Sequence, residues 1–240
     1  MLAATGRVVM ISGASRGIGA AIARRLHGDG YTVSLGARVT STAMASLGEH
    51  DPARVMAARF DALDPASARA WHAATLERFG RLDALINNAG ILREVRWDND
   101  DETALDAMWA VNVRAPLRMI RLALPALRKA GNGRIINIAS TDGKRYRDAT
   151  VSIGYAMTKH ALVALSHGAR FAGWSDGVRV AALCPGAVET ELLAGIPGAT
   201  PSGERMTPET IAHAVSFLLS LPNNASAAEL ALNARLESTI

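Results

Sequence analysis

Apolar runs rich in β-branched residues alternate along this chain with longer segments whose apolar positions recur at helical spacing. The apolar runs predict strands at 8–12, 31–36, 55–61, 82–87, 134–139 and 178–183, with a weaker one at 229–232. Helical spacing predicts helices at 20–26, 64–79, 102–129, 154–172 and 207–221. Repeated strand–helix alternation predicts a doubly wound α/β fold, in which helices cover both faces of a parallel sheet of about seven strands.

Three local signals refine this pattern. Asp64 followed by Pro65 is typical of a helix N-cap with proline at the first helical position, and Thr207 followed by Pro208 repeats the signal. The segment 195–203 is rich in glycine and proline between two ordered elements, so we expect a mobile loop there.

The first predicted strand leads directly into a glycine-rich turn, Ser12-Gly13-Ala14-Ser15-Arg16-Gly17-Ile18-Gly19. Glycines let the backbone turn sharply and bring its N–H groups close to a ligand. The helix N-terminus that follows offers unpaired donors and partial positive charge, which suit a phosphate group. A dinucleotide pyrophosphate is the natural ligand of such a turn, although a tight turn that binds nothing shows the same local pattern.

Candidate chemical groups gather at one predicted edge of the sheet. Tyr155 and Lys159 are spaced i, i+4 on a helix and therefore share one face. Ser140 follows the fifth strand, and the segments 87–90 and 184–186 also follow strands. Because ligands bind at the carboxyl ends of parallel strands, these positions predict one common site.

Composition narrows the class of protein. With 240 residues, 49% of them hydrophobic, the chain is long enough for one α/β domain spanning residues 1–240 and short for two. The formal charge of +4 fits an anionic small molecule or an acidic partner. Nucleic acid is disfavoured, because the arginines are spread along the chain without interleaved aromatic residues.

The same composition predicts a cytoplasmic protein. Cys184 is the single cysteine and permits no internal disulfide, which agrees with a reducing compartment. We expect neither a signal peptide nor a membrane-spanning segment. None of the six histidines has partners at metal-ligand spacing, so no metal site is expected.

Taken in order, the motifs of this chain resemble those of the short-chain dehydrogenase/reductase family in its single-domain form. They are Ser12-Gly13-x-x-x-Gly17-x-Gly19, Asn87-Asn88-Ala89-Gly90, Asn112, Ser140, Tyr155-x-x-x-Lys159, and Pro185-Gly186 with Thr190. The resemblance extends to about Leu221. It implies a Rossmann fold, a nicotinamide dinucleotide cofactor, a small carbonyl or alcohol substrate, and a homodimer or homotetramer.

The resemblance also implies four catalytic residues. Tyr155 would be the general acid in carbonyl reduction and the base in alcohol oxidation. The Lys159 ammonium should lower the pKa of that phenol, and the family's lysine also holds the nicotinamide ribose. Ser140 would hydrogen-bond the substrate oxygen. The main-chain carbonyl of Asn112 would bind a water molecule of a proton relay.

The sequence independently marks the carbonyl of Asn112. Pro116 lies four residues later, has no N–H to donate to that oxygen, and crowds it with its ring. The helix should therefore be distorted near Asn112, with this carbonyl released from the helical ladder and free to take another partner. A bend that merely fits the helix to the sheet is the alternative.

The expected cofactor-binding residues follow from the same resemblance. In the glycine turn they are Ser12, Gly13, Ser15, Arg16, Gly17, Ile18 and Gly19. Around the adenosine and the ribose groups they are Arg38, Asp61, Asn88, Ala89, Gly90, Tyr155 and Lys159. Near the nicotinamide they are Pro185, Gly186, Val188 and Thr190.

Two arginines favour NADP(H) over NAD(H). An NAD site usually places a carboxylate about 20 residues past the glycines, where it bonds the ribose 2′-hydroxyl. Here the second strand ends in Leu35-Gly36-Ala37-Arg38 without a carboxylate. Arg38 and Arg16 could instead bind a 2′-phosphate, although two solvated arginines would look the same in the sequence.

Departures from the family pattern bear on the substrate. Fourteen residues separate Ser140 from Tyr155, a longer segment than is usual in the family, and we expect it to line the substrate pocket. Its Lys144, Arg145 and Arg147 either form a solvated face or attract an anionic substrate.

Two other functions stay open. A β-ketoacyl thioester reductase is the first, although the chain lacks the Asp-Gly-Gly ending common in such reductases. A non-catalytic dinucleotide-sensing protein on the same fold is the second. The complete set of Ser140, Tyr155, Lys159 and Asn112 argues against the sensor, because a sensor needs only the glycine turn.

Overall fold

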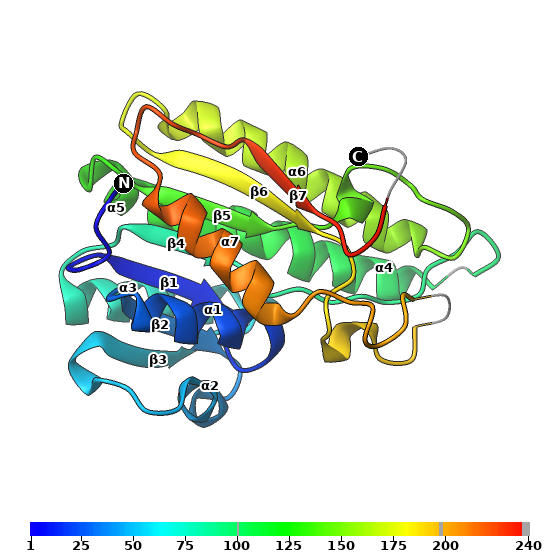
Figure 1. The fold of residues 1–240 in the computed structure, drawn as a ribbon, viewed down its shortest axis with the longest axis horizontal. Helices are drawn as coiled ribbons and strands as arrows, with labels where there is room; N and C mark the ends of the chain where they lie inside the picture. Colours follow the sequence, from blue (N-terminus) through cyan, green and yellow to red (C-terminus); the bar gives the residue numbers. More distant parts are fainter. Residues whose placement is uncertain (100, 197–198, 237–240) are drawn as a thin grey trace.

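The computed structural model describes residues 1–99, 101–196 and 199–236 and shows a layered α/β architecture (Figure 1). Seven parallel strands form one sheet in the order β3-β2-β1-β4-β5-β6-β7. Their bounds are β1 Val8–Ser12, β2 Thr32–Ala37, β3 Val55–Arg59, β4 Ala84–Asn87, β5 Arg134–Ile138, β6 Arg179–Pro185 and β7 Glu229–Leu232. The predicted doubly wound fold with about seven strands is confirmed.

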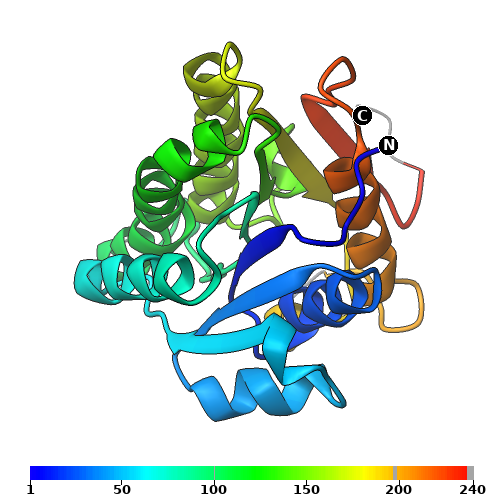
Figure 2. The ribbon, with the colours of Figure 1, turned by 90° about the vertical axis from the view of Figure 1, so that its left-hand side faces the viewer.

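Helices cover both faces of the sheet, as the view along the strands shows (Figure 2). Their bounds are α1 Gly17–Gly28, α2 Thr40–Leu47, α3 Pro65–Phe79, α4 Glu102–Trp109, α5 Ala115–Lys129, α6 Ile153–Gly173 and α7 Pro208–Ser220. Buried residues of α1, α2 and α7 share one core cluster, and those of α3 and α5 share the cluster on the opposite face.

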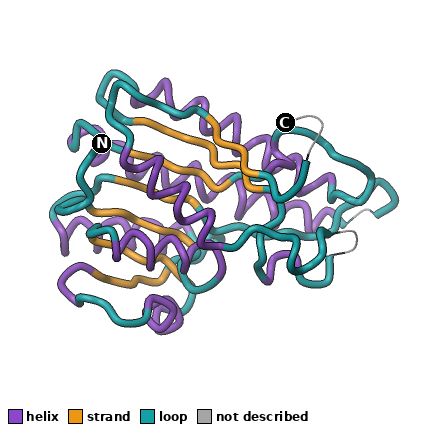
Figure 3. Tube along the Cα trace, in the orientation of Figure 1, coloured by secondary structure: helices purple, strands orange, loops and turns teal. Residues whose placement is uncertain are grey.

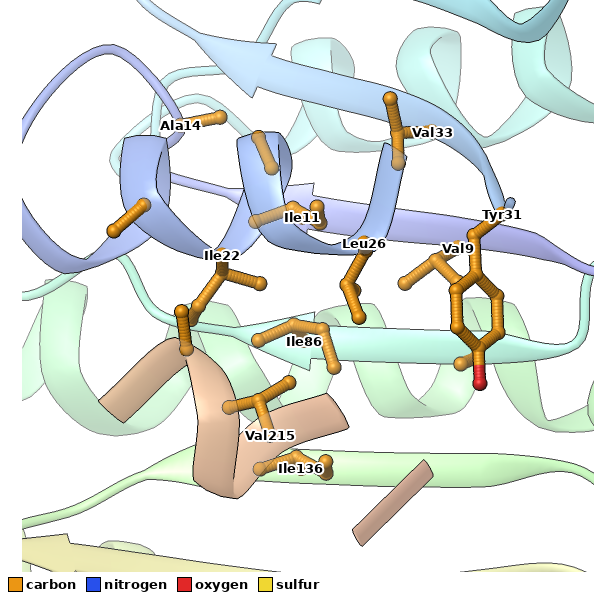
Figure 4. Close-up of a cluster of buried hydrophobic side chains, with 14 of the residues drawn as sticks. Val9, Ile11, Ala14, Ile22, Leu26, Tyr31, Val33, Ile86, Ile136 and Val215 are labelled. Atoms are coloured by element: carbon orange, nitrogen blue, oxygen red, sulfur yellow. The ribbon is translucent and has the colours of Figure 1, made fainter. Parts of the chain in front are cut away.

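Strand β1 shows how the two cores are separated. Val9 and Ile11 point into the core beneath α1 and α7, where Figure 4 shows them among the side chains of both helices. Val8 and Met10 belong to the opposite core, which also holds the fully buried Trp71 of α3. Successive side chains of a strand point to opposite faces, so an uninterrupted apolar run is what a strand buried on both sides requires.

Trp71 explains a glycine in the neighbouring strand β2. A Cβ built on Gly36 would lie 2.6 Å from the indole ring, too close for any side chain. The indole N–H donates to Ser34 Oγ at 2.9 Å, so the only buried polar atom of the ring is satisfied. The absence of a side chain at Gly36 thus lets the indole of α3 pack directly on β2.

Both predicted helix caps are present. The Asp64 side chain accepts the N–H of Ala66 at the start of α3, and the Thr207 side chain accepts the N–H of Thr210 at the start of α7. Each helix also has proline in its first turn, where a missing N–H costs nothing.

Two helical regions differ from the sequence expectation. The helix α2 was not predicted, because its small residues form little apolar stripe and Val39 gives it no capping side chain. The helix predicted over 102–129 is divided into α4 and α5 by a π-helical turn at Ala110–Arg114 (tube in Figure 3). Of the predicted mobile loop 195–203, residues 197–198 lie outside the described residues.

Within the described ranges, every helix is too short or too polar to cross a lipid bilayer.

Candidate active site

A cleft of about 510 Å³ opens at the carboxyl ends of the strands, where the sequence placed the site. The residues predicted from the sequence that line it are Gly13, Ser15, Arg16, Gly17, Ile18, Arg38, Asp61, Asn88, Ala89, Gly90, Ser140, Tyr155, Lys159, Pro185, Gly186, Val188 and Thr190. Three further predicted residues, Ser12, Gly19 and Asn112, are buried and lie outside this lining, and Ser12 and Asn112 hydrogen-bond residues that belong to it.

The glycine turn between β1 and α1 has a backbone that other residues would strain. Gly13 and Gly17 have positive φ angles of 67° and 52°. A Cβ built on Gly19 would lie 2.2 Å from the carbonyl oxygen of Gly13, so the turn and the helix could not approach as they do. The resulting cradle at the N-terminus of α1 fits a dinucleotide pyrophosphate.

Ser12 and Asn88 fasten this turn to the end of β4. The Ser12 hydroxyl donates to Ile86 O at 3.3 Å and accepts the N–H groups of Asn88 and Ala89 at 3.0 and 3.1 Å. The Asn88 amide donates in return to the carbonyls of Ser12 and Gly13 at 3.0 and 3.1 Å. The resemblance placed Asn88 near the adenine ribose, and in the structure its amide shapes the turn.

The residues proposed for chemistry meet on the other side of the cleft. Tyr155 and Lys159 project from the first turns of α6 and are 6% and 5% exposed. The Lys159 ammonium donates to Ile138 O at 2.8 Å and lies 5.5 Å from the centre of the Tyr155 ring. Ser140, two residues past β5, lines the same cleft close enough to Tyr155 to lower the pKa of its hydroxyl.

The pKa directions differ from the expectation for this pair. Burial raises the pKa of Tyr155, and the carboxylate of Asp142 raises it further, while the hydrogen bond with Ser140 opposes them. Burial also lowers the pKa of Lys159 to about 8. The expected lowering of the Tyr155 pKa by Lys159 is therefore absent, because desolvation dominates both groups.

Asn112 lies in the π-helical turn at Ala110–Arg114, so the helix is distorted where Pro116 predicts it. Its buried side chain is fully engaged. Oδ1 accepts Ile91 N–H at 2.9 Å, and Nδ2 donates to Ile91 O at 2.9 Å and to Thr158 Oγ1 at 3.1 Å. The amide thus ties the segment after β4 to α6, one residue before Lys159.

Ser152 is a buried cleft-lining residue that the sequence analysis did not single out. Its hydroxyl caps α6 by accepting Tyr155 N–H at 3.3 Å, accepts Val95 N–H at 3.2 Å, and donates to Arg93 O at 2.7 Å. One buried side chain therefore joins the cleft-lining loop at Arg93 to the helix that carries Tyr155. A serine three residues before the tyrosine is the capping signal that could have revealed it.

The three basic residues before Tyr155 do not form a positive cleft mouth. Each pairs with a carboxylate: Lys144 with Glu229, Arg145 with Asp142, and Arg147 with Asp148. Of the three, Arg147 alone lines the cleft. These ion pairs favour the alternative of a solvated face, since neighbouring carboxylates balance the charge, and attraction of an anionic substrate stays a prediction.

The two arginines expected to bind the 2′-phosphate have different surroundings in the structure. Arg38 follows β2 at the cleft edge, and in the part of the chain that the structure describes its side chain has no hydrogen bond or ion pair. Arg16 pairs with Glu191, a residue that follows β6 and also lines the cleft. The sequence analysis missed Glu191, because nothing local relates it to Arg16.

Several other lining residues come from loops without a sequence signal. They include Phe60, Leu63, Arg93, Glu94, Leu192, Leu193, Ile196, Ala234 and Arg235. No three His, Cys, Asp or Glu side chains within residues 1–99, 101–196 and 199–236 are placed to hold a metal ion.

Comparison with known proteins agrees with this geometry. Agropine synthesis reductase of Rhizobium rhizogenes is 42% identical over 219 residues, which are 91% of this chain and 50% of that protein. The chain thus spans about half the length of this relative.

Solved structures are similar over nearly the whole chain. An alcohol dehydrogenase from Thermococcus sibiricus, complexed with 5-hydroxy-NADP, is 33% identical with a TM-score of 0.82, covering 94% of this chain and 95% of that one. The 3-ketoacyl-(acyl-carrier-protein) reductase from Brucella melitensis, complexed with NADH, is 29% identical with a TM-score of 0.87, covering 96% and 98%. Residues 7–199 match the family described as short chain dehydrogenase. The chain therefore belongs to the short-chain dehydrogenase/reductase family of oxidoreductases.

Proposed function

We propose that this protein is an NADP(H)-dependent oxidoreductase acting on a carbonyl/alcohol pair, with cofactor binding and chemistry in one domain. The observation that carries the proposal is the common cleft. It joins the glycine turn to Ser140, Tyr155 and Lys159, and its lining extends from Gly13 to Arg235. The similarity to reductases and to a dehydrogenase complexed with an NADP derivative supports the same reaction class.

The cleft fits a nicotinamide dinucleotide. The cradle formed by Gly13, Gly17 and Gly19 suits the pyrophosphate, and Val188 and Thr190 line the cleft beyond it. When bound, such a cofactor supplies or accepts the hydride.

The protein's own residues handle the proton. In reduction, the Tyr155 hydroxyl donates its proton to the substrate oxygen, and the Ser140 hydroxyl hydrogen-bonds that oxygen as charge develops on it. Burial keeps Tyr155 protonated, which suits a general acid. Lys159 has a pKa lowered to about 8, so this group, 5.5 Å from the centre of the Tyr155 ring, can exchange a proton near neutral pH.

The preference for NADP(H) rests on charge at the end of β2. Arg38 follows that strand where an NAD-binding protein would offer a carboxylate, and Arg16 lies in the glycine turn. Two guanidinium groups can form charge-assisted hydrogen bonds with a 2′-phosphate. We expect NADPH to exceed NADH by at least about tenfold in kcat/KM, equivalent to about 1.4 kcal/mol.

The test is a turnover screen with NADPH and NADH against ketones, quinones, sugars and 3-oxoacyl thioesters. Turnover that prefers NADPH and is lost in Tyr155→Phe is the expected result. NADPH binding without turnover on any substrate would support a dinucleotide sensor instead. Turnover confined to acyl thioesters would establish the ketoacyl reductase function, which the similarity to the Brucella melitensis reductase favours.

A further inference from the structure

Two consecutive residues of the glycine turn face two consecutive residues that follow β6. A Cβ built on Gly17 would lie 3.2 Å from Thr190 Cγ2, so these two residues are in close contact. Beside them, the Arg16 guanidinium pairs with the carboxylate of Glu191, which begins the short turn Glu191–Leu193. All four residues line the cleft, so this contact joins its two walls at the cofactor-binding side.

The ion pair is exposed and therefore exchangeable. The side chains of Arg16 and Glu191 are 66% and 68% exposed. Such a surface pair changes an equilibrium constant by about fivefold at most, because water and salt screen the charges. A phosphate carries more charge than a carboxylate and presents several acceptor oxygens, so it can displace Glu191 from the guanidinium.

The two arginines that could receive a 2′-phosphate are thus unequal. Within the described ranges, the Arg38 side chain has no ion-pair partner, whereas Arg16 already holds a carboxylate of its own chain. We propose that Glu191 is a specificity-determining residue, which weakens NADPH binding by competing with the 2′-phosphate for Arg16. This inference rests on the proposed NADP(H) function.

The competition should weaken the binding of NADPH and leave the binding of NADH unaffected. NADPH must exchange the Glu191 carboxylate for its own phosphate at Arg16, whereas NADH has no 2′-phosphate and gains nothing from the exchange. Removing the charge of Glu191 should therefore raise the affinity for NADPH and leave the affinity for NADH unchanged. Glu191 thus reduces the difference in affinity between NADPH and NADH that the two arginines create.

The test measures dissociation constants by calorimetry at fixed ionic strength, and it needs no substrate. The probes are NADPH, NADH, 2′,5′-ADP and 5′-ADP. Glu191→Gln should tighten NADPH and 2′,5′-ADP by about two- to fivefold and leave NADH and 5′-ADP unchanged.

A matched control lies on the same segment. Glu189 pairs with Arg205 at 3.2 Å and accepts a hydrogen bond from Ser202 at 2.9 Å, and it does not line the cleft. Glu189→Gln removes the same charge two residues away and should change none of the four constants. An equal gain in both variants would show that only the net charge of the segment matters, and would overturn the proposal.

A double-mutant cycle tests whether Glu191 acts on NADPH binding through Arg16. Once Arg16→Gln has removed the guanidinium, adding Glu191→Gln should have no further effect on NADPH. Equal tightening of NADPH and NADH by Glu191→Gln would show that Glu191 repels the pyrophosphate instead, and weaker NADPH binding would show that it orders Arg16. Either result overturns the proposal. Unchanged NADPH preference in both Arg16→Gln and Arg38→Gln would instead refute the proposed cofactor preference itself.

Discussion

Ser152 offers a sharp test of how the active site is held together. Its hydroxyl serves three groups at once: the first turn of α6 at Tyr155 N–H, the N–H of Val95, and the carbonyl of Arg93. Ser152→Ala removes all three hydrogen bonds without adding bulk. We therefore expect it to reduce both the stability of the protein and the precision with which Tyr155 is placed.

The cost can be estimated from these contacts. Losing a serine N-cap costs about 1 kcal/mol, and a buried N–H left without an acceptor, here that of Val95, costs about 1–3 kcal/mol. The free energy of unfolding should therefore fall by about 2–4 kcal/mol. In a chain of this size 1 kcal/mol shifts Tm by about 2–4 °C, so we expect Tm to fall by about 4–16 °C.

Thermal unfolding and steady-state kinetics measure the two effects. Ser152→Thr keeps the hydroxyl and should restore most of the Tm, which separates the hydrogen bonds from the loss of packing. In Ser152→Ala, kcat should fall while the Kd of NADPH stays nearly constant, because the glycine turn lies on the other side of the cleft. An alanine variant with the Tm and kcat of the original protein would refute this account of the loop and helix.

Three further predictions concern the cleft. Tyr155→Phe removes the acid and keeps the ring, so turnover should fall about 100-fold or more while calorimetry shows unchanged NADPH affinity; an active variant contradicts the mechanism. Gly19→Ala places a Cβ 2.2 Å from Gly13 O, so NADPH binding should weaken by about tenfold or more, and unchanged affinity would contradict the close approach. Lys159→Met should raise the free energy of unfolding at pH 7 by roughly 2 kcal/mol. The variant removes the cost of burying an ammonium whose pKa is lowered to about 8, and the lost hydrogen bond to Ile138 O offsets part of this gain. The unfolded chain binds the extra proton between about pH 8 and 10.5, so this advantage should shrink as pH rises through that range; urea unfolding that finds the variant less stable at pH 7 would count against it.

The strands and the edge that bears the site could be predicted because their causes are local. Val8 to Ser12 form a buried strand since consecutive apolar residues suit both cores, and the glycines that follow permit one sharp turn. Pro116 predicts the distortion at Asn112 from four residues away, because a missing N–H is a property of the residue itself. Such local features can be recognised in the sequence without knowledge of the tertiary structure.

The features that could not be predicted depend on distant partners. Arg16 and Glu191 are 175 positions apart, and Lys144 meets Glu229 across 85 positions. The pKa of Tyr155 likewise depends on how deeply α6 is buried, which the spacing to Lys159 does not reveal. Sequence spacing identified the chemical groups, whereas their charge environment arises only from the packing of the sheet and helices.

The end of β1 shows how the cleft itself arises. Pairing of β1 with β2 continues to Ser12 and Gly36, and pairing of β4 with β5 continues to Asn87 and Asn137. Pairing between β1 and β4 stops one residue earlier, at Ile11 and Ile86.

The Ser12 hydroxyl satisfies the N–H groups that this early separation leaves at the end of β4. The cleft therefore begins where β1 and β4 separate, one residue after their last paired residues. A side chain without a hydroxyl at position 12 would leave the N–H groups of Asn88 and Ala89 without this acceptor.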